Sequence, residues 1–86
     1  MPAMIHSISS LEWLDLGRSN LTGPIPGNLG LLTKLKKLYL AGNQLEGTIP
    51  VGLCDLVELV ELSLAGNRLS GPIPWAIGNL NKLTVR

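Results

Sequence analysis

The 86 residues suffice for one small domain at most, since domains usually have about 100–150 residues. Seven Lys and Arg against six Asp and Glu give a net charge of +1, which offers no basic surface for nucleic acid or an anionic membrane. The single cysteine excludes an internal disulfide and is one ligand where a structural zinc site needs four, so we expect no metal. The glycine-rich stretches lack the lysine and spacing of a phosphate-binding loop, so we expect no cofactor. No run reaches the ~18 apolar residues of a spanning helix, and the first residues do not resemble a signal peptide. We therefore expect neither direct membrane insertion nor export from this chain alone.

The sequence repeats every 24 residues. A shift of that length aligns four leucines with one another, namely Leu11, Leu35, Leu59 and Leu83. Further apolar columns, a glycine column and an Ile-Pro column follow in the same frame. The frame predicts the tail of a preceding repeat over residues 1–10, complete repeats over 11–34, 35–58 and 59–82, and a truncated fourth repeat over 83–86. A stack of repeats buries each apolar face against its neighbours.

Each repeat predicts the same local structure. Alternation such as Leu38-Tyr39-Leu40 is typical of a short strand with one buried face, and strands separated by long returns must pair in parallel. Asn43 and Asn67 follow the strands, where their amides can satisfy backbone groups at the turn, whereas Ser19 occupies this column in the first repeat. We expect that first turn to be held less firmly. A glycine column next allows positive φ, and the Ile-Pro step imposes extended backbone before a short helical turn.

This pattern resembles the leucine-rich repeat family over essentially the whole chain. The segment Leu45-Glu46-Gly47-Thr48-Ile49-Pro50 looks like the 24-residue plant subclass found in receptor-like kinases, receptor-like proteins and polygalacturonase-inhibiting proteins. The resemblance implies an α/β fold: a right-handed solenoid with one parallel sheet on the concave face and short helical or 3-10 turns on the convex side. It also implies an extracellular or plasma-membrane setting, although this chain carries no recognisable export signal.

A catalytic role is not supported by the residues. His6 and Cys54 are the available base and nucleophile, and both fall in one column of the repeat, two coils apart. Their backbones would then lie ~10 Å apart, beyond the ~2.6–3.2 Å that proton transfer needs. We interpret Cys54 as a partly buried small hydrophobic residue and His6 as a surface residue. The sequence therefore predicts a protein that is not an enzyme.

The outward positions of the strands are the candidate binding surface. Their chemistry differs from coil to coil, and the residues that we expect to contact a protein or peptide partner are Trp13, Asp15, Arg18, Lys37, Tyr39, Glu61 and Ser63. By resemblance, the chain would be a recognition segment of a larger receptor-like protein. The alternative is a structural spacer, or a truncated fragment with no partner of its own.

Three further expectations follow from the sequence. Opposite charges in neighbouring coils predict the contacts Glu12–Lys36, Lys34–Glu58, Glu58–Lys82 and Lys37–Glu61. Core-type leucines at the two ends predict unpaired apolar edges and end-to-end self-association. Asn20-Leu21-Thr22 is an N-glycosylation sequon, which makes Asn20 a candidate modification site.

Overall fold

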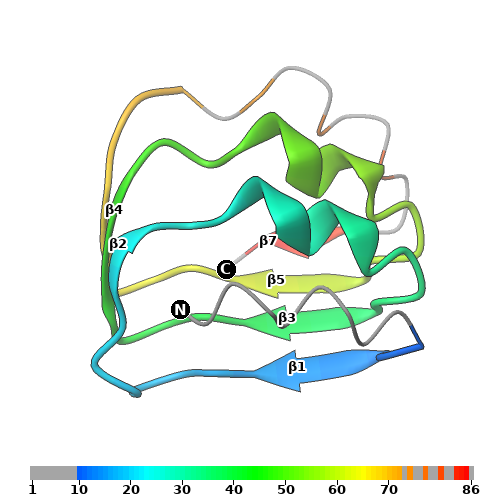
Figure 1. The fold of residues 1–86 in the computed structure, drawn as a ribbon, viewed down its shortest axis with the longest axis horizontal. Coiled ribbons are helices and arrows are strands. Elements are labelled where there is room, and N and C mark those ends of the chain that lie inside the picture. The colour runs from blue at the N-terminus through cyan, green and yellow to red at the C-terminus, as the bar shows by residue number, and fades with distance from the viewer. Residues whose placement is uncertain (1–9, 73, 75–76, 78–79, 81–82, 86) are drawn as a thin grey trace.

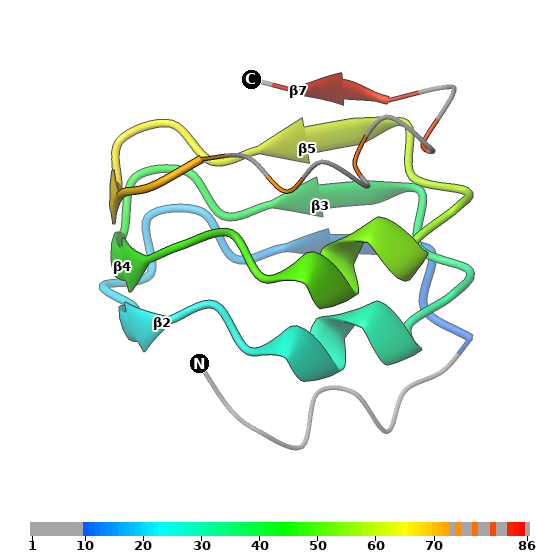
Figure 2. The same cartoon turned by 90° about the horizontal axis from the view of Figure 1, so that it is seen from above.

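The computed structural model describes residues 10–72, 74, 77, 80 and 83–85, and it shows a solenoid of stacked coils. Parallel strands line one side and short 3-10 helices cover the opposite side, as the repeat predicts (Figure 1). The elements are β1 Trp13–Asp15, β2 Thr22–Pro24, η2 Gly27–Leu31, β3 Lys37–Tyr39, β4 Gln44–Gly47, η3 Val51–Asp55, β5 Glu61–Ser63, β6 Arg68–Leu69 and β7 Thr84–Val85. Figure 2 shows the coils side by side, with β1, β3, β5 and β7 in succession.

The main sheet follows the 24-residue register through its first three strands. Leu14 lies opposite Leu38, and Leu38 opposite Leu62, so the same inward leucine recurs in each coil. The last strand departs from this register, because Glu61 lies opposite Thr84 rather than opposite Val85, where the aligned columns place it. The column that holds the inward leucine has Arg86 in the last repeat. No apolar side chain is thus available there to fix the register.

A second sheet, which the sequence did not predict, runs along one side of the solenoid. It contains β2, β4 and β6 in parallel, and its pairs join residues 22 positions apart, such as Thr22 with Gln44 and Glu46 with Arg68. This segment has no clear alternation, because glycine and proline interrupt it. Its pairing is a consequence of stacking, since the main sheet already brings successive coils to strand distance.

The core consists of the predicted leucine columns. The middle coil contributes fully buried side chains, among them Leu35, Leu38, Leu40, Leu45 and Leu53. The partly buried members lie mainly in the outer coils, and they are Leu11, Leu16, Leu21, Ile49, Leu69, Ile77 and Leu83. Ile5 and Ile8, which the sequence also assigns to the core, lie outside the described residues.

Asn43 joins the first two coils through its side chain. Its Oδ1 accepts from the backbone N–H of Ser19 at 2.9 Å and of Leu21 at 3.0 Å. Its Nδ2 donates to the carbonyl oxygens of Leu16 and Leu40 at 2.9 and 3.0 Å. Only 6% of this polar residue is exposed, so these bonds replace those that water would make.

Asn67 repeats this arrangement one coil later. Its Oδ1 accepts from the Leu45 N–H, and its Nδ2 donates to the Leu40 and Leu64 carbonyls. Ser19 breaks the series, because its hydroxyl makes one bond, to the Gly17 carbonyl at 3.2 Å. The first turn is nevertheless tied to the stack from the other side, by Asn43 of the next coil.

The glycine and Ile-Pro columns adopt the predicted backbone. Gly23, Gly47 and Gly71 all have positive φ, at 80°, 82° and 75°, where a side chain would be strained. Pro26 and Pro50 are extended, and a 3-10 helix begins directly after each. The convex turns are therefore 3-10 helices that start at the Ile-Pro step.

Gly30 allows η2 and η3 to approach each other closely. A Cβ added at Gly30 would lie 2.2 Å from the Gly52 carbonyl oxygen, which is backbone and cannot rotate away. The same addition at Gly27, in the same 3-10 helix, would meet its nearest atom, the Pro50 Cβ, at 4.0 Å. Gly27 and Gly30 thus allow a matched comparison of alanine substitutions within η2.

We predict that Gly30→Ala lowers the free energy of unfolding by about 1–3 kcal/mol, because the helices must separate. Gly27→Ala should leave it unchanged or raise it by up to about 1 kcal/mol, since Ala restricts the unfolded chain more than Gly does. Urea unfolding followed by circular dichroism measures both. Equal destabilisation by the two substitutions would contradict the close approach at Gly30.

Candidate partner-binding face

Four of the predicted site residues form a linked cluster on the outward side of β1, β3 and β5, which we call the strand face. The Trp13 and Tyr39 rings meet edge to face with centroids 6.1 Å apart, and the Lys37 amino group lies 4.8 Å from the Trp13 ring centroid. The Tyr39 hydroxyl donates a hydrogen bond to the Glu61 carboxylate. These contacts cross three strands, so each coil contributes to a single surface.

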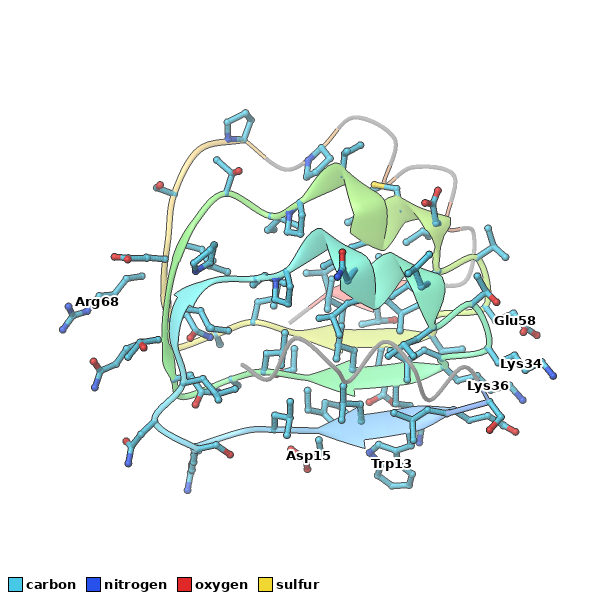
Figure 3. The ribbon with its side chains drawn as sticks, in the orientation of Figure 1. Trp13, Asp15, Lys34, Lys36, Glu58 and Arg68 are labelled. Carbon is cyan, nitrogen blue, oxygen red and sulfur yellow. The ribbon has the colours of Figure 1, made fainter. Side chains whose placement is uncertain are left out.

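Trp13 is the exposed part of this cluster. It is 59% exposed, and Figure 3 shows its side chain on β1 pointing away from the core. Tyr39 and Lys37 restrain the ring from one side through the edge contact and the cation–π contact. The strand face therefore presents a large apolar side chain whose orientation is already limited.

Asp15 and Ser63 lie on the same face but outside these contacts. Asp15 points away from β1 (Figure 3), and its carboxylate accepts from the Gly17 N–H at 3.0 Å. Ser63 lies opposite Tyr39 in the strand register and is half-buried. The backbone carbonyl of Ser63 accepts from Leu40 N–H, which continues the sheet beyond β3.

Arg18 has a left-handed backbone, with φ 53°. The same column holds Gly42 and Gly66 in the next coils, at φ 73° and 71°, so the first coil places an arginine where its neighbours have glycine. This conformation costs a non-glycine residue about 1–2 kcal/mol. The Arg18 side-chain stem lies over Gly42, since its Cγ would be 2.9 Å from a Cβ built there. Arg18 is exposed, and its guanidinium has no partner among the residues that the structure describes.

The predicted charge contacts are realised only in part. Glu12 and Lys36 form the expected ion pair at 3.3 Å, with both side chains more than half exposed. Lys37 and Glu61 are opposite each other in register, as expected, and engage Trp13 and Tyr39 respectively. Lys34 and Glu58 share one end of the molecule (Figure 3), but no ion pair joins them. Each lies three residues before its strand, whereas Glu12 and Lys36 lie directly before theirs, where the Lys36 N–H donates to the Glu12 carbonyl at 2.7 Å. The Glu58–Lys82 contact lies outside the described residues.

Cys54 is buried more completely than predicted, at 8% exposure on η3. Burial raises the pKa of its thiol, and the neighbouring Asp55 carboxylate raises it further, so the thiolate is disfavoured. His6 lies outside the described residues, and the proposed distance between it and Cys54 is not tested.

The described residues contain no group of three metal-ligating side chains. In that same part of the chain the surface has no pocket, and no helix is long and apolar enough to cross a membrane.

The solved structures that this chain resembles include ectodomains of plant receptor kinases. The chain is 41% identical over 99% of its length to the ectodomain of the receptor kinase GASSHO1/SCHENGEN3 from Arabidopsis thaliana, solved in complex with CASPARIAN STRIP INTEGRITY FACTOR 2, with a TM-score of 0.94. It is 38% identical over 99% to the Arabidopsis receptor kinase HAESA, solved with the peptide hormone IDA and the co-receptor SERK1, with a TM-score of 0.92. It spans only 10% and 14% of those two chains.

A third similar structure is a plant ice-binding protein, 35% identical over 99% of this chain and 30% of that one, with a TM-score of 0.87. A search of curated proteins gives no match. The family model for the leucine-rich repeat matches residues 9–69, which is more than half of the sequence. The chain therefore belongs to the leucine-rich repeat family, and its likeness is to plant receptor kinase ectodomains.

Proposed function

We propose that this chain is a non-enzymatic recognition module that binds a protein or an extended peptide through the strand face. The similar structures support a protein or peptide partner, since GASSHO1/SCHENGEN3 and HAESA were each solved with one. The chain spans about a tenth of these receptors, so we place the module within a larger array of coils. Its contribution would then be one section of a longer binding surface.

The observation that carries this proposal is the restrained, exposed Trp13 ring. Binding energy concentrates on aromatic anchors whose orientation is limited before the partner arrives, because less side-chain entropy is lost on binding. Trp13 satisfies both conditions, with 59% of its surface free and its ring held by Tyr39 and Lys37. We propose that an apolar or aromatic side chain of the partner packs on it.

Arg18 supports the same face from the other end of β1. An arginine kept in a left-handed conformation, where the next two coils have glycine, suggests a function that offsets the strain. Its guanidinium is exposed and able to bind a carboxylate in a bidentate manner. We propose that the partner places an acidic group near Arg18 and its apolar group near Trp13.

The chemistry of the strand face favours a peptide over ice, the second use of this fold among the similar structures. A crystal lattice repeats, so it is matched best by the same side chain in every coil. Here one column contains Trp13, Lys37 and Glu61, which share neither size nor charge. The structural-spacer alternative predicts no binding at these residues at all.

The test is selection of binders from a random peptide library with the intact chain, followed by titration of variants. We predict that Trp13→Ala weakens the selected peptides at least about tenfold, which is about 1.4 kcal/mol. Arg18→Gly should weaken peptides with an acidic group by a similar factor, while raising the free energy of unfolding by about 1 kcal/mol through relief of strain.

Arg68→Ala is the matched control, because Arg68 is an exposed cation on β6, on the second sheet, and points away from the molecule (Figure 3). It should leave the affinity unchanged. If Trp13→Ala and Arg68→Ala have equal effects, the strand face is not the binding surface. If no peptide is selected, the spacer alternative stands.

End-to-end association of two copies stays a prediction. The main sheet ends at β1 and β7 in the described part of the chain, and an open strand edge is able to pair with another chain. We expect light scattering at micromolar concentration to give a mass above that of a monomer. A monodisperse monomer would contradict self-association without affecting the strand-face proposal.

A further inference from the structure

We propose that Glu61 is a positioning residue for Trp13. It fixes the orientation of the Trp13 ring through Tyr39, so the third coil controls the anchor that the first coil presents. The consequence for binding rests on the proposed function of the strand face. The control of the ring does not depend on any partner and is measurable on the free chain.

Trp13 is restrained by side chains of the second coil. It lies on β1, where the main sheet ends in the described part of the chain, and β1 pairs with β3 (Figure 1). The ring is 59% exposed, and the two contacts that restrain it come from β3: the edge contact with Tyr39 and the cation–π contact with Lys37. The orientation of Trp13 is therefore only as stable as the positions of these two side chains.

The Tyr39 ring is held at both ends. Its Cβ belongs to β3, which pairs with β1 and with β5, and its hydroxyl donates to the Glu61 carboxylate on β5. Glu61 lies two residues before Ser63, the register partner of Tyr39, and this diagonal separation of ~7–8 Å is within reach of an aromatic side chain. A ring fixed only at Cβ can exchange between staggered χ1 rotamers, and the hydroxyl bond removes that freedom. Glu61 thus keeps the Tyr39 ring against Trp13.

Glu61 is itself well fixed. It lies on β5, between β3 and β7, so its backbone is paired on both sides, and the residue is half-buried. Its carboxylate is a charged acceptor, and such hydrogen bonds are about twice as strong as neutral ones. Lys37, the second restraint on Trp13, lies directly opposite Glu61 in the register. Both side chains that hold the Trp13 ring are therefore neighbours of Glu61 across one strand pair.

This arrangement has a consequence for binding. A partner that packs on Trp13 meets a ring whose freedom depends on a residue two strand spacings away, roughly 10 Å. A ring that is mobile before binding loses more side-chain entropy when the partner fixes it. Loss of the Glu61 carboxylate should therefore weaken binding about three- to tenfold, although Glu61 need not touch the partner.

The first test is NMR relaxation of the Trp13 indole N–H in the free, intact chain, with Trp13→Phe to assign the signal. We expect its order parameter to fall in Glu61→Ala and in Tyr39→Phe, which keeps the ring but lacks the hydroxyl. It should fall less in Glu61→Gln, which retains a neutral acceptor. Glu58→Ala is the matched control, because Glu58 is an exposed carboxylate of the same coil, three residues before β5, and should leave Trp13 unchanged.

An unchanged Trp13 order parameter in Glu61→Ala would overturn the proposal. Equal changes in Glu61→Ala and Glu58→Ala would also overturn it, since the effect would then be one of surface charge. If Glu61→Ala disturbs the fold, the backbone amide signals of the buried Leu38 and Leu62 will shift. Tyr39→Phe and Glu61→Gln then decide the matter by the same criterion.

The second test uses peptides selected with the intact chain. Glu61→Ala should weaken them about three- to tenfold, and it should have no further effect in the Trp13→Ala background, because the ring through which it acts is absent. Additive effects of the two substitutions would show direct contact of the partner with Glu61 and would overturn the positioning role. If no peptide is selected, the proposed function and this consequence for binding fall together. The relaxation measurement still decides whether Glu61 holds Trp13.

Discussion

The structure depends on the hydrogen bonds that one asparagine side chain makes to two coils. After each strand the chain turns sharply, and the turn leaves backbone N–H and C=O groups without partners in their own coil. Asn43 satisfies such groups in the first coil and in its own coil at once. Asn67 does the same one coil later. The backbone groups at the turn of one coil therefore obtain their hydrogen bonds only when the next coil is folded against it.

The strand face follows from this stacking. Because the coils stay in the 24-residue register, Trp13, Lys37 and Glu61 fall in one row, with Tyr39 in the adjacent row. The leucines beneath them are nearly identical in each coil, so the scaffold is constant while the outward residues vary. The Trp13–Tyr39–Glu61 series links three coils by side chains as well as by backbone. A partner lying across the strands would meet a surface that is already ordered.

Most of the fold was predictable from the sequence because its strongest signals recur. The leucine columns predicted the core, and the Gly and Ile-Pro columns predicted the positive φ values and the start of the 3-10 helices. The β7 register was predicted wrongly, because no inward leucine fixes it. The second sheet was missed because its segments have no alternation and pair only as a result of stacking.

The candidate site was predictable as a surface but not in its contacts. The outward positions follow from strand alternation, which placed Trp13, Lys37 and Tyr39 on one face. Lys37 lies opposite Glu61 as expected, but the contact of its amino group with the Trp13 ring depends on rotamers and was not predicted. Gly42 and Gly66 stand in the same column as Arg18, which is consistent with a left-handed backbone there. The strain at Arg18 could be recognised only from its backbone φ angle.

The central claim is that Asn43 of the second coil holds the turn of the first, and amide hydrogen exchange measured by NMR tests it most directly. The N–H groups of Ser19 and Leu21 donate to Asn43 Oδ1, whereas the N–H of Asn20 between them has no partner in the described part of the chain. The account predicts that Ser19 and Leu21 exchange at least about tenfold more slowly than Asn20, relative to unfolded-chain rates. Exchange of all three at one common rate would contradict it.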